Sequence, residues 1–464
     1  MRTARLLCGI ALLICVANLT TSSAVGDDWP TSLGPRMDSI WRESGIVERF
    51  PESGPKVRWR APVAGGFAGP AVAAGRVFVA DRVESPKPVG APAEPANPDP
   101  WTRVTSYGTE RLLCFRESDG QQLWKYEYPC VYTNAKNYAI GPRSMPQVDG
   151  DRVYMLGAEG DLSCVEASSG KLIWHTDYKK EFGLKTPIWG WSCHPLVDGD
   201  RLITIAGGKG NAVVAYNKMT GERIWSALSC KEPGYSSPII YKVGGKRLLL
   251  VWLGETFSAL NPETGDVYWS IPSQPRFGMS IGVPRLYGDL IYLGATFDFG
   301  QMLRLGPTAD DVKVLWTTDS QIGAGSPMAT PLFFDGVYYG DRRSGSYICF
   351  DPETGEKHWE TFAASTGGRP ANYSNIFTIL HDPSDGKSKE AARLFLVNEK
   401  GDLIIARPSP KRYEEIDRCH LIEPTYRVMG RTVVWSHPAF ANRSIYYRND
   451  KEIICVSLAA EDAE

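Results

Sequence analysis

Residues 350–359 have the sequence Phe-Asp-Pro-Glu-Thr-Gly-Glu-Lys-His-Trp, and four other stretches of the chain repeat this pattern. Each copy predicts a β-strand, a tight turn and a second strand that ends on tryptophan. The Asp, Asn or Ser of the turn caps its own backbone, and the glycine accepts the positive φ that such turns need. The other copies occupy residues 115–124, 165–174, 216–225 and 260–269.

A second pair of strands precedes the copies. In residues 146–156 and 195–205 the turn sequence Val-Asp-Gly-Asp-Arg separates two short apolar runs. Each unit therefore has four antiparallel strands, which is the composition of a propeller blade. The repeats predict an all-β fold with one β-propeller domain over residues 56–460.

The tryptophans that end the repeats give the number of blades. Six of them recur at intervals of 43 to 51 residues: Trp124, Trp174, Trp225, Trp269, Trp316 and Trp359. A last unit, residues 434–458, has only three strands, and residues 56–60 carry Trp59 with no hairpin before it. We expect this N-terminal strand to complete the last blade and to remove an open sheet edge. Eight blades result, and seven is the competing count.

All seven of these tryptophans are interpreted as structural. A large ring at the end of each outermost strand is expected to dock between neighbouring blades, where aromatic burial stabilises the ring of blades. Cofactor binding is the less favoured role for them.

Two segments depart from the repeat. Residues 25–55 form an extended lead-in, and residues 84–100 form an insertion with six prolines, which cannot be a central strand. The insertion lies between the second and third strands of the first blade. It is therefore expected on the face that carries the loops between blades, as a lid or a docking arm.

Residues 1–24 have the features of a signal peptide. Arg2 and Arg5 precede an apolar run over residues 6–16, and Ser22-Ser23-Ala24 offers small residues to a signal peptidase. Cys15 follows a bulky Ile14, which disfavours a lipid anchor. No later stretch is apolar enough to span a membrane, so we expect an exported protein, periplasmic or secreted, and a monomer. With 51 Lys and Arg against 53 Asp and Glu, a nucleic-acid partner is not expected.

The cysteines follow the repeat. Cys114, Cys164, Cys349 and Cys455 occupy one equivalent position, where other copies carry alanine, so the position is a small buried slot and these thiols are expected to be free. The pairing of the remaining cysteines stays open: Cys130, Cys193, Cys230 and Cys419.

The pattern Ala/Cys-x-Asp/Asn-x-x-Thr-Gly-x-x-x-Trp resembles the tryptophan-docking repeat of the quinoprotein alcohol dehydrogenase-like propellers, the PQQ-repeat superfamily. The lead-in, from Asp28-Trp29-Pro30 to Gly54-Pro55-Lys56-Val57, is similar to that of secreted bacterial BamB-like proteins. The resemblance implies one of two functions. One is a non-catalytic scaffold of the envelope, as in outer-membrane protein assembly. The other is an alcohol or sugar dehydrogenase that uses PQQ with calcium.

Three features favour the scaffold over the enzyme. The chain has no adjacent cysteines and no Cys-x-x-Cys-His haem site, and no motif matches the family's Glu, Asn and Asp metal ligands. We therefore expect no catalytic residue, no metal and no cofactor, with the PQQ-dependent dehydrogenase as the alternative. A polysaccharide-binding surface protein is a third hypothesis.

Loops that join one blade to the next should converge on a central funnel, which would bind an envelope protein or a glycan. Arginine, tryptophan and histidine concentrate there and suit an acidic or extended polar partner. The competing interpretation is that they fill the channel. His194 and His437 start inner strands of different blades, and packing is favoured over zinc binding for both because no third ligand accompanies them. The predicted funnel residues are Arg143, Trp189, Trp191, His194, Tyr235, Arg276, Arg369, Asn372, Arg431, Trp435 and His437.

Overall fold

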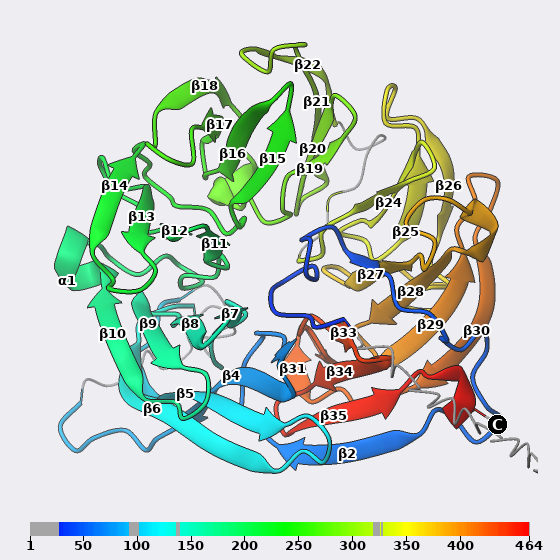
Figure 1. The fold of residues 1–464 in the computed structure, drawn as a ribbon, viewed down its shortest axis with the longest axis horizontal. Coiled ribbons are helices and arrows are strands. Elements are labelled where there is room, and N and C mark those ends of the chain that lie inside the picture. Colours follow the sequence, from blue (N-terminus) through cyan, green and yellow to red (C-terminus); the bar gives the residue numbers. More distant parts are fainter. Residues whose placement is uncertain (1–26, 92–101, 136–139, 319–324, 326–327, 464) are drawn as a thin grey trace, which may run out of the picture.

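Eight four-stranded antiparallel sheets stand around a central axis (Figure 1). The computed structural model describes residues 27–91, 102–135, 140–318, 325 and 328–463. The predicted all-β propeller of eight blades is confirmed, and the competing count of seven is wrong. The predicted signal peptide, residues 1–24, lies outside the described residues.

Within each of the first four blades, the strands follow one another from the axis outward. Blade 1 has β3 (Ala71–Ala73), β4 (Arg76–Glu84), β5 (Ser106–Arg116) and β6 (Gln122–Tyr132); blade 2 has β7 (Gln147–Asp149), β8 (Arg152–Leu156), β9 (Asp161–Glu166) and β10 (Leu172–Asp177); blade 3 has β11 (Leu196–Asp198), β12 (Arg201–Ile205), β13 (Val213–Asn217) and β14 (Arg223–Ala227); blade 4 has β15 (Ile239–Val243), β16 (Lys246–Trp252), β17 (Thr256–Leu260) and β18 (Val267–Pro272).

The other four blades continue this order, and the last one takes its outer strand from the start of the domain. Blade 5 has β19 (Arg285–Tyr287), β20 (Leu290–Ala295), β21 (Phe299–Leu305) and β22 (Val312–Thr317); blade 6 has β23 (Leu332–Phe334), β24 (Val337–Asp341), β25 (Tyr347–Phe350) and β26 (Lys357–Thr361); blade 7 has β27 (Ile376–His381), β28 (Arg393–Asn398), β29 (Asp402–Arg407) and β30 (Glu414–His420); blade 8 has β33 (Ala439–Ala441), β34 (Ser444–Arg448), β35 (Glu452–Ser457) and β2 (Val57–Pro62).

Short elements lie in the connections. They are a helix, α1 (Tyr178–Phe182), a hairpin of β31 (Tyr426–Val428) with β32 (Arg431–Val433), and the 3-10 turns η2 (Arg276–Gly278), η3 (Lys389–Ala391) and η4 (Ala460–Asp462). Among the residues described, no helix has the length and apolar character needed to cross a membrane.

The docking tryptophans and the turn glycines fit one another. Each of the seven indole N–H groups donates a hydrogen bond to a backbone carbonyl of the next blade, as Trp124 does to Ala167 at 3.1 Å. Gly170, in the turn of blade 2, has a φ of 73° and lies against the Trp124 ring, where a Cβ would collide with it. The Thr-Gly turn and the tryptophan of the repeat are therefore the two halves of one contact between blades.

The ring closes through β2. This strand pairs antiparallel with β35, with Trp59 opposite Cys455, as the sequence predicts. Closure covers the outer edge of β35 and gives the last blade four strands like the others.

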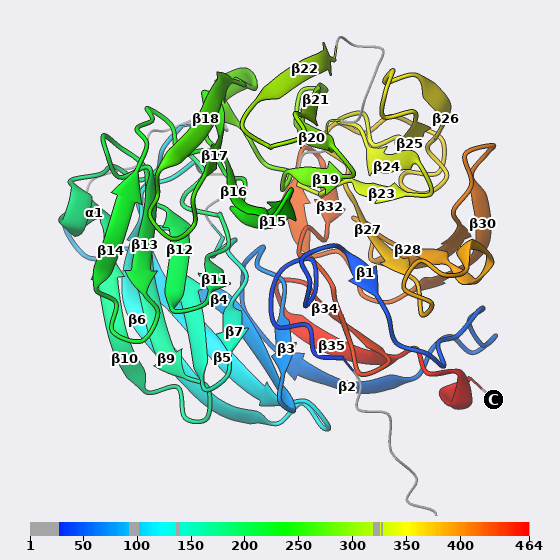
Figure 2. The same cartoon turned by 45° about the horizontal axis from the view of Figure 1, so that its top comes forward.

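The lead-in crosses the lower face of the ring. Its residues bond to the inner strands of blades 1, 2 and 5 and then reach blade 7: Trp29 bridges Val72, the Pro30 carbonyl accepts from Val148, and Arg285 donates to the carbonyls of Met37 and Asp38. β1 (Ile40–Trp41) then pairs parallel with β27 as a fifth strand. Figures 1 and 2 show the lead-in, in dark blue, running from the middle of the ring toward its rim.

The opposite, upper face carries two sets of loops. Because neighbouring strands are antiparallel, loops that join one blade to the next, such as residues 183–195, emerge beside the loops between second and third strands, such as residues 296–298. The proline-rich insertion joins β4 to β5 and belongs to the second set. Most of it, residues 92–101, lies outside the described residues.

Candidate ligand-binding pocket

A cavity of about 820 Å³ lies where the loops of the upper face converge. Its wall is contributed by loops of every blade, and Ser32 and Leu33 of the lead-in also line it. Aromatic and aliphatic side chains predominate in the lining: Leu33, Phe67, Ile188, Trp189, Tyr235, Phe277, Met279, Ile281, Val283, Phe297, Met328, Tyr373 and Trp435. A concave, mostly apolar site of this size suits a small molecule or one anchoring side chain of a partner.

Two neutral histidines stand in the wall. The rings of His194 and His437 meet edge to face with their centres 6.0 Å apart. Burial lowers the pKa of His194 to about 3 and that of His437 to about 4. Nδ1 of His194 accepts the backbone N–H of Met145 at 2.9 Å, so the proton of the neutral ring is on Nε2.

Blade 4 contributes the acidic groups of the lining. Burial raises the pKa of Glu232, while the nearby charge of Arg103 opposes that rise. Glu255 accepts the backbone N–H of Lys231 at 3.2 Å. Arg103 and Lys231 also line the cavity, so both signs of charge meet on this side.

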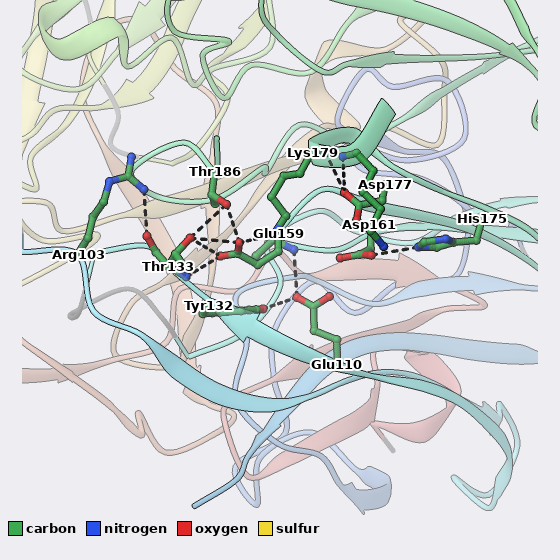
Figure 3. Close-up of polar contacts among 12 residues, drawn as sticks. Arg103, Glu110, Tyr132, Thr133, Glu159, Asp161, His175, Asp177, Lys179 and Thr186 are labelled. Atoms are coloured by element: carbon green, nitrogen blue, oxygen red, sulfur yellow. Dashed lines mark hydrogen bonds and ion pairs between the residues drawn. The ribbon is translucent and has the colours of Figure 1, made fainter. Parts of the chain in front are cut away.

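A polar network beside the cavity positions Arg103 (Figure 3). Its guanidinium donates to the Thr133 carbonyl at 3.0 Å, and the Thr133 amide donates to Glu159 at 2.8 Å. Glu159 also accepts from Thr186 and pairs with Lys179 at 2.8 Å. Arg103 is thus attached to a rigid group of hydrogen bonds between blades 1 and 2.

Deeper in the same region, Glu110 is fully buried. Its carboxyl group accepts hydrogen bonds from Tyr128, Tyr132 and the backbone N–H of Ala158. Burial raises its pKa. This group fastens blade 1 to blade 2 and does not line the cavity.

Six of the predicted funnel residues line the cavity: Arg143, Trp189, His194, Tyr235, Trp435 and His437. Arg143 stacks over Phe67, with its guanidinium carbon 4.9 Å from the ring centre. Trp189 and Tyr235 meet edge to face at 5.6 Å. The structure thus brings together residues that are up to about 300 positions apart in the sequence.

The other five predicted residues lie outside the lining. Trp191 is buried between blades and donates to the Ala206 carbonyl at 2.8 Å, and Arg431 forms an ion pair with the buried Glu399 at 2.8 Å. Arg276 stands at the mouth, stacked on Phe277 at 4.9 Å. Arg369 and Asn372 are exposed on one loop of the upper face.

Three residues at or near the cavity were missed by the sequence analysis. Arg103, Phe297 and Arg343 come from loops between the second and third strands of blades 1, 5 and 6, whereas only loops between blades were searched for funnel residues. The antiparallel order of the strands puts both sets on one face, and this topological signal was available in the sequence.

Comparison with known proteins agrees with this architecture. The family model described as outer membrane protein assembly factor BamB matches residues 108–361, more than half of the chain. The chain belongs to the BamB family of PQQ-repeat propellers. No curated protein matches it significantly.

Among solved structures, BamB from Moraxella catarrhalis aligns with a TM-score of 0.51 at 15% identity, covering 75% of this chain and 91% of that one. A europium-containing methanol dehydrogenase aligns with a TM-score of 0.44 at 12% identity, covering 82% and 90% of the two chains. The quinohemoprotein alcohol dehydrogenase of Comamonas testosteroni gives 0.38 at 12% identity, with coverages of 93% and 80%. The BamB alignment supports the fold, and the two lower scores carry no argument.

The cavity of this BamB-family propeller presents few carboxylates to a calcium-bound quinone. Calcium takes six to eight oxygen ligands, usually with several carboxylates. The cavity offers the carboxylates of Glu232 and Glu255, and among the described residues no group of three His, Cys, Asp or Glu side chains could hold a metal ion. The donor set therefore does not support a PQQ site with calcium.

Proposed function

We propose that this protein is a non-catalytic binding propeller of the bacterial envelope and that the central cavity is its binding site. The observation that carries the proposal is the cavity itself, with an aromatic wall at the meeting point of the loops and Leu33 of the lead-in in its lining. Membership of the BamB family supports an envelope location and export. A role in outer-membrane protein assembly is the specific form of this proposal.

The electrostatics of the cavity favour binding over catalysis. A general acid or base works best when its pKa lies near the working pH. The pKa values of His194 and His437, about 3 and about 4, keep both rings neutral and poorly basic at pH 7. They serve better as packing groups and fixed hydrogen-bonding groups of a binding wall.

An envelope protein is the partner we propose, and a glycan is the alternative outcome of the test. The proline-rich insertion emerges on the same face as the cavity. Stiff, extended segments of this composition suit a docking arm beside a concave surface.

The experiment is a pull-down from envelope extract with wild type and Phe277→Asp. Phe277 is 62% exposed at the mouth of the cavity, and its φ of 59° is a conformation that aspartate tolerates, so the fold is expected to survive. Met219→Asp is the matched control, on an exposed turn of the lower face.

Loss of the partner with Phe277→Asp alone supports the proposal. The same partners recovered with all three proteins would reject the cavity as the binding site. Recovery of glycan in place of protein would establish the alternative partner.

A further inference from the structure

Three aromatic residues surround the mouth of the cavity in an unusual backbone conformation. Phe277, Phe297 and Tyr373 have φ values of 59°, 61° and 62°, in the left-handed region that bulky residues rarely adopt. Their rings form a chain, with centres 5.6 Å apart between Phe277 and Phe297 and 5.9 Å apart between Phe297 and Tyr373. Such strain persists where the surrounding structure holds it, and it gathers at functional sites.

Two arginines lie against these rings. The guanidinium carbons of Arg276 and Arg343 are each 5.0 Å from the centre of the Phe297 ring. Arg343 also lies 5.0 Å from the ring of Tyr373. A stacked guanidinium uses its face for the ring and keeps its N–H groups directed outward in its own plane.

Neither arginine pairs with a carboxylate among the described residues, although neighbouring arginines do. Arg342, the residue before Arg343, bonds to Asp298 at 3.4 Å, and Arg431 pairs with Glu399. The fold therefore neutralises arginines close by while these two retain their donors and their charge.

The balance of charge at the cavity is positive. Its only lining carboxylates among the described residues are Glu232 and Glu255, and Glu232 is balanced by Arg103. Against these two carboxylates the lining has three cations, Arg103, Arg143 and Lys231. At the mouth, Arg276 and Arg343 add two more, beside Arg342 and Asp298, which pair with each other. This favours an anion in a site whose walls are apolar.

We propose that the cavity binds a small organic carboxylate with an apolar body. The carboxylate is held at the mouth by Arg276 and Arg343, and the apolar body enters the cavity between Phe297 and Trp189. This proposal rests on the proposed function, because it takes the cavity as a binding site, and it adds a small-molecule ligand of that site to the envelope-protein partner. A volume of about 820 Å³ lies within the range of small-molecule sites.

The test compares matched ligands by isothermal titration calorimetry on the intact protein. The probes are 2-naphthoate, decanoate and the neutral 2-naphthamide, which distinguish a planar body from an aliphatic chain and a charged head from a neutral one. Wild type is expected to bind at least one of the two carboxylates about tenfold or more tightly than the amide, because a hydrogen bond to a charged group is worth about that ratio.

Arg276→Gln and Arg343→Gln are the variants, and Arg412→Gln is the control, since Arg412 is exposed on the outer rim of blade 7. Each variant is expected to weaken carboxylate binding about tenfold and to leave the binding of 2-naphthamide unchanged. Arg412→Gln is expected to change neither affinity.

Equal affinity of wild type for 2-naphthoate and 2-naphthamide, with decanoate no tighter, would overturn the inference, as would no carboxylate binding at millimolar concentration. Equal loss of both naphthyl ligands in the arginine variants would show that the arginines only shape the mouth and would also overturn it. The pull-down with Phe277→Asp separates these results from the proposed function. A partner lost there, with no preference for carboxylates, leaves the binding site in place and rejects the ligand class.

Discussion

Trp59 of β2 lies opposite Cys455 of β35, and this register position joins parts of the chain almost 400 residues apart. The indole N–H of Trp59 also donates to the Glu117 carbonyl of blade 1 at 2.7 Å. One residue therefore completes the sheet of blade 8 and docks that blade against blade 1.

Closure through Trp59 can be tested by substitution. Trp59→Ala is expected to lower the free energy of unfolding by about 3–5 kcal/mol, the usual cost of removing a buried tryptophan, measured by denaturant unfolding. Trp59→Phe should cost less because it keeps most of the ring. Deletion of residues 1–60 should expose the edge of β35 and cause self-association, seen by light scattering. A monomeric deletion variant with unchanged melting would contradict this closure.

The turn glycines can be tested in matched pairs. Gly170→Ala adds a Cβ that collides with the Trp124 ring at a φ of 73°, whereas Gly150→Ala adds one at a φ of 58° with no atom within 4 Å. Gly150→Ala should cost about 1 kcal/mol of stability from the backbone alone. Gly170→Ala should cost clearly more, because the blade contact must also shift. Stability is measured by thermal unfolding. Equal losses for the two variants would show that the turn glycine does not contribute to the docking of the tryptophan.

The thiols of the repeat should be inert in the folded protein. Cys114, Cys164, Cys349 and Cys455 are free and buried, and burial raises the pKa of each to about 11 or 12. Thiolates are the reactive form, so a thiol reagent should label these residues only after denaturation. Peptide mapping of labelled native protein checks this. A native disulfide at any of the four would contradict the expectation.

His437 should make stability depend on pH. Its folded pKa is about 4 and its ordinary value is 6.5, so between these pH values the unfolded chain binds a proton that the folded protein does not. Stability is therefore complete above pH 6.5 and falls on acidification by about 1.4 kcal/mol per pH unit at this residue.

The matched variant is His437→Gln, which does not titrate and whose amide can replace the ring as donor to the Met328 carbonyl. The difference in unfolding free energy between wild type and variant should shift by about 2 kcal/mol against wild type from pH 6.5 to pH 4.5. Comparing the two proteins cancels the contributions of groups that His437 does not contact, such as His381, while the pKa of His194 is expected to rise slightly in the variant because the charge of His437 helps to lower it. Parallel pH profiles would show that His437 is protonated in the folded state.

The repeated part of the fold could be predicted from the sequence because each blade repeats the same local chemistry. The Asp-x-x-Thr-Gly-x-x-x-Trp pattern specifies a turn, a strand and a contact between blades at once, so the count of eight and the closing strand followed. β1 could not be predicted in this way. Ile40 and Trp41 form two residues of strand in a lead-in without a period, and only their contact with β27 makes them a strand.

The pocket was predicted less well because side-chain partners in loops are set by tertiary contact. Arg431 and Arg276 look alike in sequence, yet Arg431 pairs with Glu399 while Arg276 stacks on Phe277. Phe297 lies in a loop within blade 5, and Arg343 lies in the corresponding loop within blade 6. Their shared position at the mouth depends on the curvature of the whole ring. The residue types in the loops therefore indicated which face of the propeller carries the pocket. Which of these residues line the pocket could be seen only in the three-dimensional structure.

The position of the lead-in has a consequence for the order in which this protein folds during synthesis. The lead-in is synthesised before any blade, yet Ile40 and Trp41 pair with β27 of blade 7, and closure by β2 waits for β35. Blades can fold one after another as they emerge, since each contacts mainly its neighbours. The lead-in is made before the blades but is thus among the last segments to reach its place, and a chain that ends before blade 7 lacks the strand that pairs with β1. Binding of a ligand in the cavity is therefore expected only after the ring has closed and the lead-in has docked.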